Sequence, residues 1–299
     1  MRATIWALVS LAVLASSGPA DAKTYRWVAP NGVVTYSDQP PQLSPVEGER
    51  DALIDEALDI SGITRQIKGL PAQVKAGVDL SQSPLPPKER AAVVKVIGDA
   101  FRPAAILATL RSAFQKNYDP LQMGLVLAQL RTPLSRKMTA LEGKADAADI
   151  VQNLRAFVAE LKAAPPPPER VARLARLEVA TGATDFVLDL KVASLTAVFK
   201  VASALMPPDK RPTAAAAEAM AKKLMGQQRE AARREMLVLF LYVYLGATDE
   251  ELDEYIGMLS AEPGRWFQAI YRRGMIEALS AATEAAMRQV AKTFPAKPL

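Results

Sequence analysis

The stretch that decides the fold is RAAVVKVIGDAFRPAAILATLRSAFQK, residues 90–116. Its large apolar residues recur every three or four positions, which places them on one face of a helix. They are Val93, Val94, Ile97 and Phe101, followed by Ile106, Leu107, Leu110 and Phe114. Burying one such side chain stabilises a fold by roughly 1.5–3 kcal/mol, and an isolated helix cannot bury its own face. The stretch therefore predicts helices that pack against one another.

Signals for helix ends surround this stretch. Proline stands before or in a first turn, with an acidic residue close behind, in three places. These are residues 86–90, 165–170 and 207–211. Thr248 and Glu251 have the spacing of a capping box, and Gly182 and Gly246 are predicted to follow helix ends. From Asp51 onward the chain is thus predicted to be a mainly α, multi-helix bundle.

The most apolar segment is MLVLFLYVYL, residues 236–245. A bilayer needs about 20 apolar residues, so this segment is too short to span one. It is predicted to be a helix buried on all sides. We expect no transmembrane segment after the amino-terminal leader.

Two landmarks recur in the same order along the helical part. LDISGIT at 58–64 resembles LEVATGAT at 177–184, and the segment 119–136 parallels 249–265, each ending in arginine. This indicates a duplicated helical unit. The predicted domains are residues 51–164 and 165–293, with a tail at 294–299. The pattern also looks like domain of unknown function 2059, a family of exported helical proteins.

The amino-terminal part differs from the rest. Residues 24–41, TYRWVAPNGVVTYSDQPP, contain two β-rich runs around Asn31 and Gly32, the pair that favours a two-residue hairpin turn. That turn predicts a β-hairpin module over residues 23–41, with Trp27 opposite Tyr36. A linker is predicted at 42–50.

One face of this hairpin is predicted to be aromatic. It would carry Tyr25, Trp27, Val34 and Tyr36. A two-stranded hairpin is only marginally stable in water, so something must cover the face. Two alternatives remain: the face docks on the helical part, or it is an interaction surface for a partner.

These residues resemble domain of unknown function 4124, an amino-terminal module of exported proteobacterial proteins. The resemblance rests on Tyr25 to Val28, Asn31 to Val34 and Tyr36 to Pro41. The acidic residue that the family usually has after the Trp-Val pair is Ala29 here. The resemblance implies a cell-envelope location and no activity, since the module precedes varied partners, including cell-wall lytic transglycosylases.

The first 22 residues read as a cleavable signal peptide. Arg2 precedes a 13-residue, mostly apolar run, and Ala20 and Ala22 are the small residues before a cut. Cleavage after Ala22 would export the protein to the periplasm. The alternative is an uncleaved membrane anchor.

The chain of 299 residues contains no Cys and no His. This excludes thiolate and imidazole catalysis, disulfides and His-ligated zinc. The net charge of +5 is dispersed among apolar and acidic neighbours, so we expect no nucleic-acid partner. Phosphate-binding, serine-hydrolase and calcium-loop motifs do not occur, and an acidic run at 249–254 is explained by helix capping. No catalytic, cofactor or metal residue is predicted.

These observations predict a non-catalytic binding or scaffold protein of the cell envelope. An envelope protein or a peptidoglycan component is the expected kind of partner, and the oligomeric state stays open. Two alternatives remain. One is a cell-wall glycan-cleaving enzyme that uses carboxylates, which needs an acid of raised pKa. The other is binding of an apolar ligand, such as a lipid, in the methionine-containing helical core.

Overall fold

The computed structural model describes residues 25–28, 34–37, 47–77, 86–147, 149–204 and 212–293. Contacts divide the chain into two compact units, Met1–Val46 and Glu47–Leu299. The predicted signal peptide, most of the predicted linker and the predicted tail lie outside the described residues.

In the first unit, β1 (Tyr25–Val28) pairs with β2 (Val34–Ser37) in antiparallel fashion. Trp27 lies opposite Thr35 and not opposite Tyr36, so the predicted register is wrong by one residue. The predicted turn at Asn31 and Gly32 lies outside the described residues. The two-residue turn that the sequence favours would require the other register, because five residues separate the paired strands.

A register shift of one residue exchanges the faces of one strand relative to the other. The basis for placing Tyr25 and Trp27 on one face with Val34 and Tyr36 is therefore lost. The side chains of these four residues are outside the described part of the structure, so an interaction surface here stays a prediction.

The second unit is helical, as the sequence predicts. Its first helix begins at Glu47, within the predicted linker. The helices of its first part are α1 (Glu47–Ile60), α2 (Ile63–Gly77), α3 (Pro87–Ala100), α4 (Pro103–Lys116), α5 (Pro120–Leu130), α6 (Pro133–Glu142), the 3-10 turn η1 (Gly143–Asp146) and α7 (Ile150–Ala163). Those that follow are α8 (Pro168–Thr181), α9 (Ala183–Ala204), α10 (Ala214–Gly226), α11 (Arg229–Val243), the 3-10 turn η3 (Tyr244–Gly246), α12 (Asp249–Ser260) and α13 (Glu262–Thr293).

Most of the predicted helix-end signals act as expected. Helices α3 and α8 begin at Pro87 and Pro168, where a missing N–H costs no hydrogen bond. Thr248 and Glu251 form a complete capping box at the start of α12. Gly182 follows α8 with φ of 58°, a left-handed conformation that favours glycine. The predicted start at 207–211 lies outside the described residues.

Two expectations about the apolar segment 236–245 are wrong. Gly246 ends η3 and does not adopt a left-handed conformation, because the chain tightens into a 3-10 turn after α11. The helix is also not buried on all sides. Phe240 and Val243 are buried, but Leu245 is 60% exposed, since neighbouring helices pack against one face of α11 and leave its end uncovered. No helix in the described ranges is both long and apolar enough to cross a membrane.

The helices enclose two hydrophobic cores. The first core joins α1, α2, α4 and α5 to the carboxy-terminal helix α13, and the second joins α6, α8, α11 and α12. Fully buried members of the first core are Ile54, Ile67, Leu110, Phe114, Met123 and Leu127. Those of the second are Met138, Leu174, Leu177 and Leu252.

The packing repeats in order along the chain. Helix α1 packs on α2, α4 and α5, and α8 packs on α9, α11 and α12. The turns after α1 and α8 each contain a glycine with positive φ, Gly62 at 80° and Gly182 at 58°. The same order of packing thus occurs in α1 to α5 and in α8 to α12, and the duplicated unit stays a prediction.

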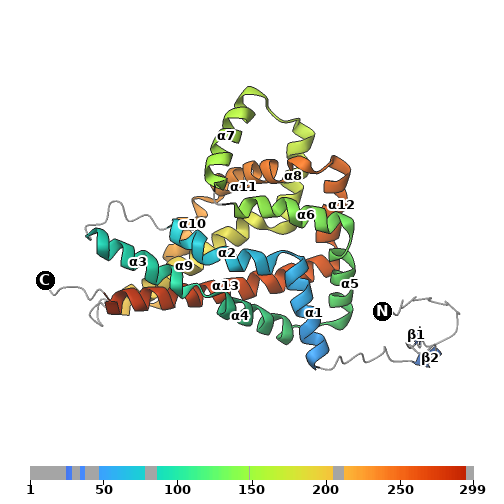
Figure 1. Cartoon of the computed structure of the whole chain (residues 1–299), viewed down its shortest axis with the longest axis horizontal. Coiled ribbons are helices and arrows are strands. Elements are labelled where there is room, and N and C mark those ends of the chain that lie inside the picture. Colours follow the sequence, from blue (N-terminus) through green and yellow to red (C-terminus); the bar gives the residue numbers. More distant parts are fainter. Residues whose placement is uncertain are drawn as a thin grey trace. The chain divides into compact units, whose positions relative to one another are not determined.

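The two halves are not separate domains, however. Figure 1 shows α13, in red, passing along α9, α3 and α4, which it contacts together with α5. The last helix therefore completes the core of the first half. The packing does not follow the predicted division between residues 164 and 165, because α13 is shared.

Candidate functional site

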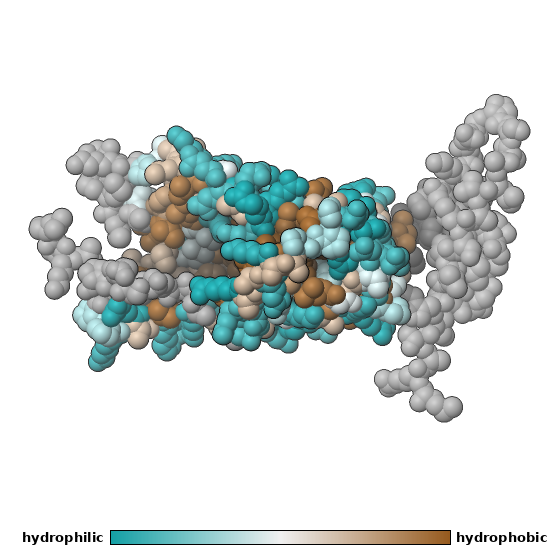
Figure 2. Space-filling model, turned by 90° about the horizontal axis from the view of Figure 1, so that it is seen from above, coloured by the Kyte–Doolittle hydropathy of each residue, from teal (hydrophilic) through white to brown (hydrophobic). Residues whose placement is uncertain are grey.

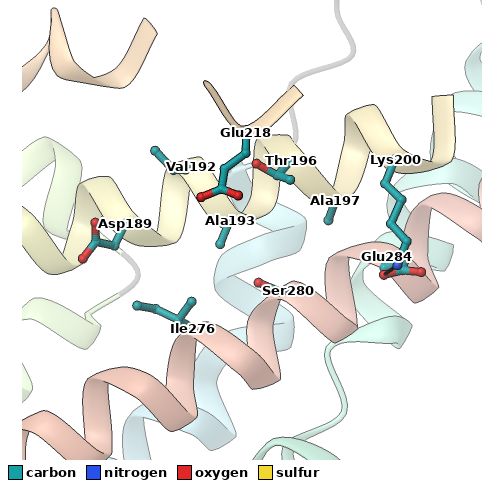
Figure 3. Close-up of a pocket in the computed structure, with 10 residues that line it drawn as sticks. All are labelled: Asp189, Val192, Ala193, Thr196, Ala197, Lys200, Glu218, Ile276, Ser280 and Glu284. Atoms are coloured by element: carbon teal, nitrogen blue, oxygen red, sulfur yellow. Dashed lines mark hydrogen bonds and ion pairs between the residues drawn. The ribbon is translucent and has the colours of Figure 1, made fainter. Parts of the chain in front are cut away.

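A surface groove of about 390 Å³ lies between α9, α10 and α13. We call it the α9–α13 groove. Its lining residues are Asp189, Val192, Ala193, Thr196, Ala197, Lys200, Glu218, Ile276, Ser280 and Glu284. Figure 3 shows that α9 and α13 contribute most of them and that Glu218 enters from α10.

The floor of the α9–α13 groove is apolar. It contains Val192, Ala193 and Ala197 of α9 and Ile276 of α13. Ala193 and Ala197 are four residues apart, which places them on one side of α9, and Figure 3 shows that this side faces α13. The alanines and Ser280 are small, which leaves space between two helices that otherwise pack closely. The hydroxyl of Thr196 is buried and has no hydrogen-bond partner among the described residues.

The rim is charged, and its carboxylates are paired. Nζ of Lys200 lies 2.9 Å from Oε2 of Glu284, across the groove from α9 to α13. Nζ of Lys222 lies 2.6 Å from Oε1 of Glu218, and this hydrogen bond raises the pKa of Lys222. Asp189 pairs with Arg272 at 3.4 Å. The groove therefore presents oppositely charged residues in close pairs around an apolar floor.

A second cluster surrounds Glu142, the last residue of α6. Its Oε1 accepts hydrogen bonds from the hydroxyls of Tyr244 at 2.7 Å and Tyr255 at 2.8 Å. Burial raises the pKa of the Glu142 carboxyl, against the opposing effect of the two hydroxyls. Burial likewise raises the pKa values of both tyrosines well above their ordinary value.

A carboxyl of raised pKa meets one requirement of a general acid. Asp146 lies nearby and pairs with Arg65, whose Nε is 3.2 Å from its Oδ2. Glu142 nevertheless does not line the α9–α13 groove, and its Oε1 is already engaged by two hydroxyls. The cluster has the properties of a buried polar network that joins α6 to η3 and α12.

The acidic run at the start of α12 is held by α8. Asp249 pairs with Arg170 and Arg173, and Asp253 pairs with Arg173 and Arg176. Within the described ranges, no group of three or more acidic side chains is placed to hold a metal ion. These acids therefore serve helix capping and helix pairing.

Sequence reasoning identified neither the α9–α13 groove nor the Glu142 cluster. The tyrosines that bind Glu142 are 102 and 113 residues away along the chain, so no local spacing connects them. The groove leaves a weak local signal, the small residues Ala193 and Ala197 on an otherwise bulky apolar helix. Such residues are also common in closely packed helices.

The comparison with known families concerns the amino-terminal third. Residues 11–95 match the family model described as Domain of unknown function (DUF4124). This confirms the resemblance drawn from residues 25–41, and the match extends through α1 and α2 into α3. No curated protein and no solved structure matches the chain.

Proposed function

We propose that the chain is a non-catalytic binding or scaffold protein of the cell envelope. The observation that carries the proposal is the α9–α13 groove, where an apolar floor is surrounded by charged side chains in ion pairs. Binding sites for small molecules commonly combine an apolar lining with a few fixed polar groups. Each rim carboxylate is paired with a basic side chain, an arrangement that can hold the polar part of a ligand in a fixed position.

The shape and chemistry of the groove favour an amphipathic ligand. Val192, Ala193, Ala197 and Ile276 offer an apolar bed, and the ion pairs at the rim offer polar contacts. The sequence also allows the alternative that an apolar ligand binds inside the helical core. Large buried side chains fill both cores, so the surface groove is the better location for such a ligand.

Binding of N-phenyl-1-naphthylamine, a neutral apolar dye, tests the groove. We expect the fluorescence of the dye to rise with the wild-type protein and to fall with Ala193→Phe, which fills the floor. The matched control is Ala172→Phe on the exposed side of α8. Circular dichroism and the Tm would establish that both variants fold. Equal dye binding by the two variants would overturn the groove as a site.

The envelope location is part of the proposal. It is supported by the signal-peptide pattern of residues 1–22 and by the location that the DUF4124 resemblance implies. Amino-terminal sequencing of the protein from a periplasmic fraction is expected to begin at Lys23. Recovery of Met1 would contradict it.

The amino-terminal residues are a proposed partner surface. Tyr25 and Trp27 of β1 and Val34 and Tyr36 of β2 are expected to contact an envelope protein or a peptidoglycan component, although the observed register does not place them on one shared face. Photo-crosslinking in vivo from position 27 or 36, followed by mass spectrometry, tests this. Crosslinks found only within the chain would reject the partner surface.

Carboxylate-dependent glycan cleavage remains the second candidate function, and the raised pKa of Glu142 is the observation that favours it. A peptidoglycan zymogram decides between the two. The binding proposal predicts no lytic band. A band that Glu142→Gln abolishes would establish the enzyme instead.

A further inference from the structure

A second surface groove, of about 490 Å³, lies where the α1–α2 turn meets the α5–α6 turn. It is lined by Glu56, Ile60, Arg65, Leu130, Arg131, Arg136, Thr139 and Ala140. We call it the arginine groove. Its guanidinium groups come from three different helical segments, so tertiary packing brings them together.

Two of its three arginines are engaged by carboxylates. Arg131 forms a two-pronged pair with Glu56, with Nε and Nη2 at 2.7 and 2.6 Å from the two carboxylate oxygens. Arg65 pairs with Asp146 at 3.2 Å and donates from Nη2 to the carbonyl of Thr139 at 3.3 Å. These bonds fix both guanidiniums at the groove wall.

Arg136 differs from these two. It is exposed, and its guanidinium has no ion-pair or hydrogen-bond partner among the residues that the structure describes. The lining residues include three arginines and one carboxylate, Glu56, so the lining of the groove is basic. Arg136 lines the groove from the first turns of α6.

The second helical unit shows how an arginine at this position can be used. Arg265 is the counterpart of Arg136 in the parallel segments 119–136 and 249–265, and its Nη1 donates to the carbonyl of Ser260 at the end of α12. In the first unit, the position that corresponds to Ser260 is Arg131, and its side chain forms hydrogen bonds with Glu56. Arg136 therefore does not repeat the structural role of its counterpart.

We propose that the arginine groove binds a phosphate-class oxyanion carried on an organic molecule. Arg136 would supply the main charge-assisted hydrogen bonds, because the planar guanidinium fits phosphate oxygens. Ile60, Leu130 and Ala140 would contact the apolar part of the ligand. The site is distinct from the α9–α13 groove, with which it shares no lining residue.

Calorimetric titration of the full chain with phenyl phosphate, an oxyanion on an apolar ring, tests the proposal. We expect phenyl phosphate to bind more tightly than inorganic phosphate. Arg136→Gln should weaken binding about tenfold or more, the usual effect of losing a hydrogen bond to a charged group. Arg136→Lys keeps the charge without the planar fork and should fall between the two proteins.

The matched control is Arg155→Gln on α7, which also removes one exposed arginine charge. It should bind phenyl phosphate as the wild type does. An equal loss of affinity in Arg136→Gln and Arg155→Gln would show that only net charge matters, and this would overturn the site. If the wild type does not bind phenyl phosphate at about 10 mM, the affinity is weaker than that of even a weak specific site. That result would also overturn the proposal.

Vesicles separate the two sources of such a phosphate. If phosphatidylglycerol vesicles displace phenyl phosphate and phosphatidylcholine vesicles do not, the natural ligand is a lipid headgroup. If neither displaces it, the ligand is a soluble organic phosphate. Displacement by both vesicle types would also assign the phosphate to a lipid headgroup, because phosphatidylcholine carries a phosphodiester as well.

Discussion

At the scale of single residues, Glu142 connects segments that are remote in sequence. Its side chain accepts hydrogen bonds from two tyrosine hydroxyls, that of Tyr244 in η3 and that of Tyr255 in α12. Tyr244 itself is only 2% exposed. A buried hydroxyl without a partner is costly, so the glutamate and the tyrosines depend on one another. The cluster thus fixes how the end of α6 meets the second core.

Replacing Glu142 tests this dependence. Glu142→Ala leaves both hydroxyls without their acceptor and should lower the free energy of unfolding by about 1–3 kcal/mol for each unpaired group. Glu142→Gln keeps Oε1 and should cost clearly less. Urea denaturation followed by circular dichroism measures both. Equal costs for the two variants would show that the hydrogen bonds contribute nothing.

The raised pKa of Glu142 adds a pH dependence. Its stabilising contribution is complete below the ordinary carboxyl pKa of 4.5 and is lost as the pH rises through the higher folded value. The stability of the wild type relative to Glu142→Gln should therefore fall as the pH rises above the ordinary carboxyl pKa and through the higher folded value. A difference that does not change with pH would contradict the raised pKa.

At the scale of elements, α12 shows how local sequence sets a helix start. The hydroxyl of Thr248 accepts from the N–H of Glu251 at 3.2 Å, and the Glu251 carboxylate accepts from the N–H of Thr248 at 2.7 Å. Lys137 of α6 also holds Glu251, and these bonds keep the pKa of its carboxyl below the ordinary value. One local motif therefore also serves a contact between helices.

Removing the cap tests its contribution. Thr248→Ala should destabilise the protein by about 1 kcal/mol, the typical effect of losing an N-cap side chain. Thr248→Ser keeps the hydroxyl and should restore most of the loss. The shift of the urea midpoint at unchanged slope measures it. If Thr248→Ser is as unstable as Thr248→Ala, the loss of stability comes from the missing methyl group and not from the hydrogen bond of the cap.

At the scale of the whole helical unit, α13 joins the two halves. The ring of Phe114 in the first core lies 4.9 Å from that of Phe267 and 6.2 Å from that of Trp266, both of α13. Helix α13 also contacts α9 and α12 of the second half. The two cores are therefore expected to unfold together.

Large-to-small changes in each core test this cooperativity. Phe114→Ala should cost about 3–5 kcal/mol and Leu252→Ala about 2–5 kcal/mol, because both side chains are fully buried. Each should lower a single thermal transition that circular dichroism and tryptophan fluorescence report at the same temperature. A variant that splits the transition in two would show that the halves fold independently.

These scales also separate what could be predicted from what could not. The spacing of Val93, Ile97 and Phe101 predicts a helix without reference to any other part of the chain, and prolines and the Thr248 cap locate several boundaries. The hairpin register was missed because Asn31 and Gly32 favour a short turn, whereas the observed pairing leaves five residues between the strands. The composition of the apolar segment 236–245 predicts more burial than the structure shows, because composition alone does not say which face of a helix its neighbours cover.

The sequence by itself determined the mainly α class, the resemblance of the amino-terminal part and the repeated order of landmarks around Gly62 and Gly182. Only the tertiary structure decided that α13 completes the first core, that Glu142 meets Tyr244 and Tyr255, and that Arg65 and Arg136 line one groove. The physical reason is range. Helix periodicity and capping depend on residues within a few positions of one another, whereas cores, networks and grooves depend on which remote faces come into contact.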